Sequence, residues 1–219
     1  QRQQWRLPNF SEAVLAPFTE EQIAAFVDRW YAHIAQIRLG MTTTEAQGRA
    51  TLLKHAITQS VHLRELAPRP LLLTLMASLH AWRGGSLPEG REQLYDESVE
   101  LLLDIWERPK TILDAASKHV LQTESMAERQ RCPQARVRAA LEKLAYEVHS
   151  KQVTATGTAD IEEGALVLAL MHAAQDPDLK QARMIEYIRD RAGLLTNHGE
   201  GIYSFPHRTF QEYLAARHL

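Results

Sequence analysis

The chain of 219 residues has a single cysteine, Cys132, no apolar run long enough to cross a bilayer, and a net charge of only −2. One cysteine excludes an internal disulfide and suits a reducing compartment. The balanced charge gives no global field that would recruit nucleic acid or an acidic membrane. No signal peptide opens the sequence. We therefore expect a cytoplasmic protein without a membrane partner.

Catalytic motifs are lacking as well. No G-x-x-x-x-G-K-[ST] occurs, and the sole double glycine, Gly84-Gly85, is followed by Ser86 and Leu87. Nothing would therefore cradle nucleotide phosphates or place a hydroxyl for magnesium. The ten histidines form no His-x-x-x-His and no zinc spacing with the cysteine, and there is no G-x-S-x-G elbow. We expect no catalytic residue, no metal site and no enzyme activity in this chain on its own.

The first half predicts a helical domain over residues 19–108, because apolar side chains recur there at helical spacing. Proline is well tolerated at a first helical position, which favours a helix start at Arg69-Pro70. The aromatic stripes of these helices are typical of core packing. The predicted helices run from a Thr19 cap to Ile37, around 52–57, from Arg69-Pro70 to Gly84-Gly85, and from Pro88 to Trp106.

Residues 109–133 are polar and bounded by prolines, which predicts a linker with a short helix around Ile112 to Leu121. Residues 134–219 predict a winged-helix domain. Helices are expected over 137–148, 161–174 and 182–192, followed by β-like runs at 194–196 and 202–205 around a glycine-bearing loop. The predicted fold is thus mainly α, a helical bundle domain followed by three helices, a β-hairpin and a C-terminal helix.

A winged helix also raises the alternative of a nucleic-acid-binding regulator. From Gln134 to Leu219 there are ten Lys or Arg and eleven Asp or Glu, a net charge of 10 − 11 = −1. A surface that tracks phosphates is expected to be distinctly basic. The predicted recognition helix is basic only in part, with Lys180, Arg183, Arg189 and Arg191 interrupted by Glu186 and Asp190. DNA binding is therefore the less favoured alternative.

The C-terminal segment places His207 directly ahead of a strong helix start. Thr209-x-x-Glu212 is a capping-box pattern, in which hydroxyl and carboxylate satisfy the free amides of the first turn. A helix start also attracts anions, and His207 could donate to the same phosphate. Local chemistry alone favours the simpler interpretation, in which His207 is a cap or a half-buried spacer.

Several motifs shift the interpretation of His207 from a helix cap toward a phosphate contact. The motif F-x-H-R-T-F-Q-E-Y-L-A-A, which begins at Phe205, closely resembles the end of the winged-helix domain in NACHT proteins, the signal-transducing NTPases of the STAND class. Leu66 to Met76 resembles the N-P-L-L-L segment of the helical domain that follows the NACHT nucleotide-binding core. The stretch from Leu87-Pro88 to Trp106 and the opening from Trp5 to Tyr31 also resemble the family, so the resemblance covers nearly the whole chain.

The resemblance implies the C-terminal part of a NACHT module, lacking its P-loop core, with residues 1–18 as the tail of that core. The helical and winged-helix domains would close over ADP or ATP held, with Mg²⁺, by an upstream P-loop domain of the same chain. Pro70 would pack against adenine, Thr74 would reach the sugar or phosphates, and His207 would bind the β-phosphate of ADP. Exchange to ATP would free the domains to oligomerise and signal. The Q-E-Y-L-A-A style resembles bacterial members, where the class is implicated in antiphage defence.

Overall fold

The computed structural model of the chain describes residues 16–37, 41–107, 111–113, 120–122, 134–152, 157–174 and 194–219. The chain falls into two compact units, Gln1–Arg91 and Glu92–Leu219, and each has buried apolar side chains of its own. Within the described part, no helix combines the length and the apolar character that crossing a membrane requires.

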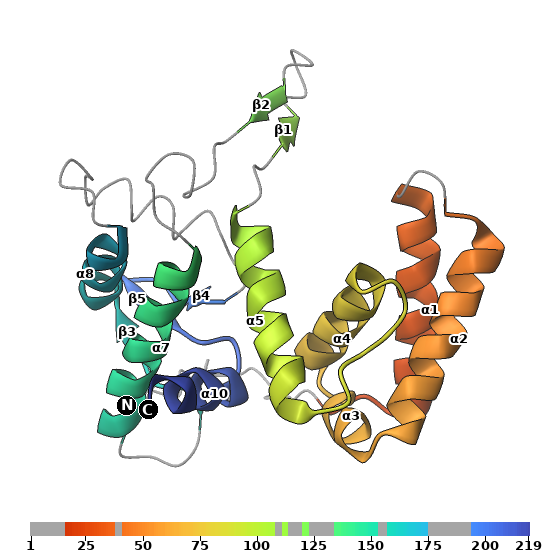
Figure 1. Ribbon diagram of the computed structural model, residues 1–219, viewed down its shortest axis with the longest axis horizontal. Coiled ribbons are helices and arrows are strands. Elements are labelled where there is room, and N and C mark those ends of the chain that lie inside the picture. Colours follow the sequence, from red (N-terminus) through yellow and green to blue (C-terminus); the bar gives the residue numbers. More distant parts are fainter. Residues whose placement is uncertain are drawn as a thin grey trace, which may run out of the picture. The chain divides into compact units, whose positions relative to one another are not determined.

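The first unit is helical, as predicted. Its elements are α1 (Glu20–Ile37), α2 (Thr43–Gln59), α3 (Val61–Leu66) and α4 (Pro70–Trp82). Helices α1 and α2 lie side by side (Figure 1). The predicted cap at Thr19 is confirmed: its hydroxyl accepts from the amide of Gln22 at 3.3 Å, and the Gln22 side chain accepts from the Thr19 amide at 2.9 Å. This reciprocal pairing fixes where α1 begins.

Helix α4 has the limits that its sequence predicts. Pro70 occupies the first turn, where its missing N–H costs no hydrogen bond. After Trp82 the chain leaves the helix through Gly84 and Gly85, whose φ values of +77° and +114° suit glycine. The Gly85 amide donates to the carbonyl oxygen of His80 at 2.8 Å, so the turn also satisfies a carbonyl of the last helical turn.

A polar pair lies inside the core of this unit. The Tyr31 hydroxyl on α1 and Nδ1 of His80 on α4 are 2.5 Å apart, and both residues are almost fully buried. Burial raises the pKa of Tyr31 to about 12, so the phenol stays protonated and donates to the imidazole. The pair therefore needs a neutral His80 ring.

Acid should weaken the fold through His80. Burial and the nearby charge of Arg49 lower the pKa of His80, so the unfolded chain takes up a proton at a higher pH than the folded one. The stabilisation is complete above the unfolded pKa of about 6.5 and is lost as the pH falls toward the lower folded value. We expect the melting temperature to drop between about pH 7 and pH 5, and to drop less in His80→Gln. Equal slopes in the two proteins would assign the effect to other histidines.

Helix α5 (Arg91–Glu107) begins three residues after the predicted start at Pro88. The unit boundary lies between Arg91 and Glu92, so nearly all of α5 belongs to the second unit. The sequence pattern instead assigns this helix to the helical domain of residues 19–108. The limits 19–108, 109–133 and 134–219 themselves remain predictions.

The predicted short helix around Ile112 to Leu121 is wrong. Instead, β1 (Thr111–Leu113) and β2 (Val120–Gln122) form an antiparallel pair in which Ile112 lies opposite Leu121. Short apolar runs of this length fit a strand or a helix equally well by periodicity, and here the pairing decides between them.

The rest of the second unit has the winged-helix order, which confirms the predicted fold class. Its elements are α7 (Gln134–Lys151), β3 (Ile161–Glu162), α8 (Glu163–Ala174), β4 (Thr196–Asn197), β5 (Ile202–Ser204) and α10 (Arg208–His218). The predicted hairpin is present as β4 and β5, with Asn197 opposite Tyr203. The helix predicted over 182–192 lies outside the described residues.

One strand was not predicted. Ile161, expected at the start of a helix, lies in β3, and β5 runs between β3 and β4 in the sheet. Tyr203 of β5 lies opposite Ile161, and its hydroxyl donates to Glu163 at 3.1 Å. Helix α10 packs closely on α7, and these two helices lie beside the sheet and α8 (Figure 1). Only Phe205 and Pro206 separate the end of β5 from His207, which directly precedes α10.

Candidate functional site

His207 is the residue immediately before α10 and caps that helix. Its backbone is extended, with φ −149° and ψ 144°, and its half-buried ring accepts a hydrogen bond from the Thr209 amide. The Nδ1 to amide distance is 3.2 Å, and the Thr209 hydroxyl lies 2.8 Å from the same nitrogen. The simpler interpretation of this histidine, a helix cap, is therefore confirmed.

The cap also determines the state of the ring. Because Nδ1 accepts the Thr209 amide proton, a neutral imidazole at this position carries its own proton on Nε2. His207 is thus held in one tautomer with Nε2–H as a donor. Anion binding by His207 stays a prediction.

The capping box predicted for Thr209 and Glu212 is wrong. Thr209 is already the second residue of α10, and the Glu212 carboxylate accepts from Nε of Arg208 at 2.7 Å. The imidazole of His207 caps the helix by accepting from the Thr209 amide, so the helix begins earlier in the chain than a cap at Thr209 would place it. The Glu212 carboxylate is instead paired with Arg208, one turn earlier on the same helix.

Pro70 and Thr74 lie one turn apart at the start of α4. Pro70 is exposed, so its apolar ring is accessible to solvent. The half-buried Thr74 donates its hydroxyl to the Pro70 carbonyl oxygen at 2.8 Å, which places both residues on the same side of the helix. A hydroxyl that donates in this way keeps lone pairs for an incoming donor.

The structure thus brings together two of the three predicted nucleotide-binding residues. Pro70 and Thr74 belong to the first unit, and His207 belongs to the second. Joint contact of the three with one nucleotide stays a prediction. The basic residues expected on a DNA recognition helix lie in the interval 175–193, outside the described residues.

Gln211, which the sequence analysis missed, holds the surroundings of His207 in place. It is fully buried, and its carbonyl oxygen accepts from the Ala159 amide at 2.8 Å. Its amide group donates to His149 Nδ1 at 3.2 Å and to Gln152 Oε1 at 3.0 Å. One side chain therefore joins α10 to the end of α7 and to the loop before β3. A glutamine between Phe210 and Leu214, on an apolar helix face, is the sequence feature that could have revealed it.

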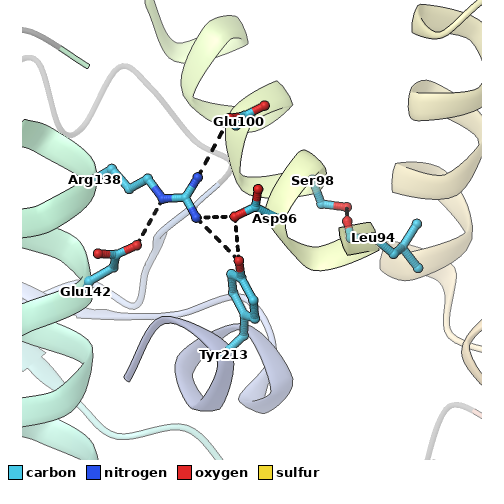
Figure 2. Close-up of polar contacts among 7 residues, drawn as sticks. All are labelled: Leu94, Asp96, Ser98, Glu100, Arg138, Glu142 and Tyr213. Atoms are coloured by element: carbon cyan, nitrogen blue, oxygen red, sulfur yellow. Dashed lines mark hydrogen bonds and ion pairs between the residues drawn. The ribbon is translucent and has the colours of Figure 1, made fainter. Parts of the chain in front are cut away.

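A second polar cluster joins α5, α7 and α10 (Figure 2). Arg138 of α7 binds Asp96 of α5 through Nη2, and its Nε donates to Glu142 at 2.9 Å. The Tyr213 hydroxyl of α10 donates to the same Asp96 oxygen at 2.6 Å. Glu100 of α5 lies 3.9 Å from Arg138 Nη1. No local sequence pattern announces this cluster, because its members come from three separate helices.

The cluster shifts the titration of its members. Partial burial alone would raise the pKa of Asp96, but hydrogen bonds from Tyr213 and Arg138, with the charges of Arg138 and Arg217, hold it below its usual value. Burial and the bond to Asp96 raise the pKa of Tyr213 to about 12. Asp96 is therefore charged and Tyr213 is a neutral donor across the ordinary pH range.

Comparison with known families decides what this winged helix is. Residues 91–219, more than half of the chain, match the family model described as a winged helix-turn-helix domain C-terminal to NACHT. The chain belongs to this family. The match starts at the first residue of α5, so this NACHT-associated domain includes the helix that Arg138 binds. It also confirms the predicted C-terminal part of a NACHT module. No curated protein and no solved structure matches the chain.

Proposed function

We propose that the chain is the regulatory helical and winged-helix part of a NACHT NTPase. It would close over ADP or ATP bound to a P-loop domain upstream in the same protein, and couple the bound nucleotide to oligomerisation and signalling. Membership in a family of domains that lie C-terminal to NACHT supports the regulatory role. The observation that carries the nucleotide contact is His207, fixed by Thr209 in the tautomer that donates from Nε2.

Each proposed contact suits the chemistry of its residue. The exposed ring of Pro70 offers a rigid apolar face for an adenine base. Thr74 is oriented by its bond to the Pro70 carbonyl and has lone pairs for a sugar hydroxyl. His207 would donate from Nε2 to a β-phosphate oxygen beside the positive end of α10. The P-loop core would supply the phosphate cradle and hold Mg²⁺.

The proposed mechanism is a population shift. A ligand changes the balance of two arrangements only if it contacts them differently. A bond between His207 and the β-phosphate exists only when the winged helix is closed over ADP, so ADP favours that closed state. Exchange for ATP would release the domains to oligomerise. The C-terminal motif resembles that of bacterial members, where the class is implicated in defence against phage and in signalling, and this resemblance supports a role of either kind.

The proposal is tested by comparing the 219-residue chain with a protein that carries the NACHT core ahead of it. We expect the longer protein to bind ADP as a monomer and to assemble with ATP. The shorter chain offers only edge contacts and should neither hydrolyse ATP nor bind ADP at micromolar affinity. Titration calorimetry measures binding, and mass photometry measures assembly. Micromolar ADP binding by the shorter chain would contradict the proposal. Tight, salt-sensitive binding of duplex DNA would favour the nucleic-acid alternative.

A further inference from the structure

The chain connection does not by itself hold α5 against the winged helix. Residues 108–133 separate the end of α5 from the start of α7, so contacts must hold this helix in place. Some of these contacts are aromatic. The Tyr95 ring meets Phe210 edge-on at 5.3 Å and stacks on Tyr213 at 5.7 Å. Ring pairs in these geometries stabilise the packing of α5 beyond the burial of their apolar area.

The polar contacts also fix the register of α5. One oxygen of Asp96 on α5 accepts from Arg138 of α7 and from Tyr213 of α10, so two helices hold the same atom. Arg138 Nη2 is also within 3.3 Å of the Tyr213 hydroxyl, which closes the triangle that Figure 2 shows. A shift of α5 by one residue would move the carboxylate away from both donors.

The charge balance makes this attachment depend on Arg138. Its side chain is only 16% exposed and faces three carboxylates, those of Asp96 and Glu100 on α5 and of Glu142 on α7. With Arg138 present, the carboxylates of α5 and α7 share one cation. Without it, like charges on the two helices would face each other, and of its two donors Asp96 would keep Tyr213 alone.

We infer that Arg138, Asp96 and Tyr213 form a clasp, a polar cluster that makes α5 and the winged helix move as one rigid unit. When the winged helix moves, α5 would then move with it. The hinge of the chain would lie before α5, near Glu92, rather than after α5. The inference rests on the proposed function only for that movement. The attachment itself needs no nucleotide.

Hydrogen exchange of the 219-residue chain, followed by mass spectrometry, tests the clasp. In Arg138→Gln we expect the amides of α5 to exchange about tenfold faster or more, while those of α7 and α8 change little. Tyr213→Phe keeps the aromatic stack and removes one donor, so α5 should exchange about threefold faster. Lys143→Gln is the matched control, because Lys143 lies on the same helix, is 65% exposed and approaches Glu147 only to 3.9 Å. It should leave α5 unchanged.

A second substitution separates charge from packing. Asp96→Asn in the Arg138→Gln background removes a repelling carboxylate and should return part of the lost protection to α5. Unchanged exchange of α5 in Arg138→Gln would overturn the clasp, as would equal acceleration of α5, α7 and α8. Neither result would contradict the proposed function. That function is contradicted if the bound nucleotide does not control assembly in a protein whose clasp is intact.

Discussion

In a protein that carries a NACHT core ahead of this chain, His207→Ala is expected to release ADP about tenfold faster or more and to raise spontaneous assembly. The substitution removes the Nε2–H donor that would hold the β-phosphate in the closed state. A hydrogen bond to a charged group contributes about 1.5–3 kcal/mol, which corresponds to at least a tenfold change in the balance of the two states. Nucleotide binding at the core should persist, because the P-loop is untouched.

The cap must be separated from this contact, since His207 also binds the Thr209 amide. Loss of a cap alone costs about 1 kcal/mol of stability. His207→Asn provides the control: asparagine is a good cap and can accept from the Thr209 amide, but its shorter side chain would not reach the phosphate. We expect His207→Asn to keep the melting temperature and still to speed ADP release. If both variants release ADP at the normal rate and only His207→Ala melts earlier, His207 is a cap and nothing more.

The sequence predicts the helices well where a cap or a breaker marks their ends. Thr19 and Pro70 each lie where the pattern places a helix start, and the hairpin of β4 and β5 forms around the glycine-bearing loop at Gly199. These features are local, since a side chain satisfies an amide a few residues away or a glycine permits a turn. The family resemblance of the C-terminal motif reaches the same winged helix by another route.

What the sequence does not predict depends on contacts between distant residues. Strand β3 has only two residues and exists because Ile161 pairs with Tyr203. Helix α5 has the same apolar pattern as the helices before it, and its ring contacts and hydrogen bonds with residues of α7 and α10, far away in the sequence, attach it to the second unit. The start of α10 differs from the predicted capping box because the ring of His207, and not the Thr209 hydroxyl, caps the helix.

The candidate site shows the same division. Pro70, Thr74 and His207 come from resemblance to the family, and the structure adds the tautomer of His207 and the orientation of Thr74. The sequence does not indicate a structural role for Gln211 or Arg138, because polar side chains on a helix are usually exposed. Their importance comes from burial and from partners far away in the sequence.

Gln211→Leu is expected to destabilise the second unit by about 3 kcal/mol. Leucine fits the apolar face between Phe210 and Leu214, so loss of volume is not the cause. The Ala159 amide loses its 2.8 Å acceptor, and the His149 ring and the Gln152 side chain lose the donor that Gln211 supplies. A buried donor or acceptor left without a partner costs about 1–3 kcal/mol, so the total is expected to lie near the upper end of that range. Urea denaturation of the 219-residue chain measures the change.

The matched control is Gln134→Leu, the same exchange at the first residue of α7, where the side chain is partly exposed to solvent. It should change the free energy of unfolding by no more than about 0.5 kcal/mol, as substitutions away from buried polar networks usually do. Gln211→Glu adds a further comparison: its carboxylate can still accept from Ala159 but cannot donate to His149 or Gln152, so its loss should be at least as large. A neutral result for Gln211→Leu would mean that water replaces the glutamine. The loop at Ala159 would then not depend on α10, and the position of His207 would rest on the packing of the apolar face of that helix alone.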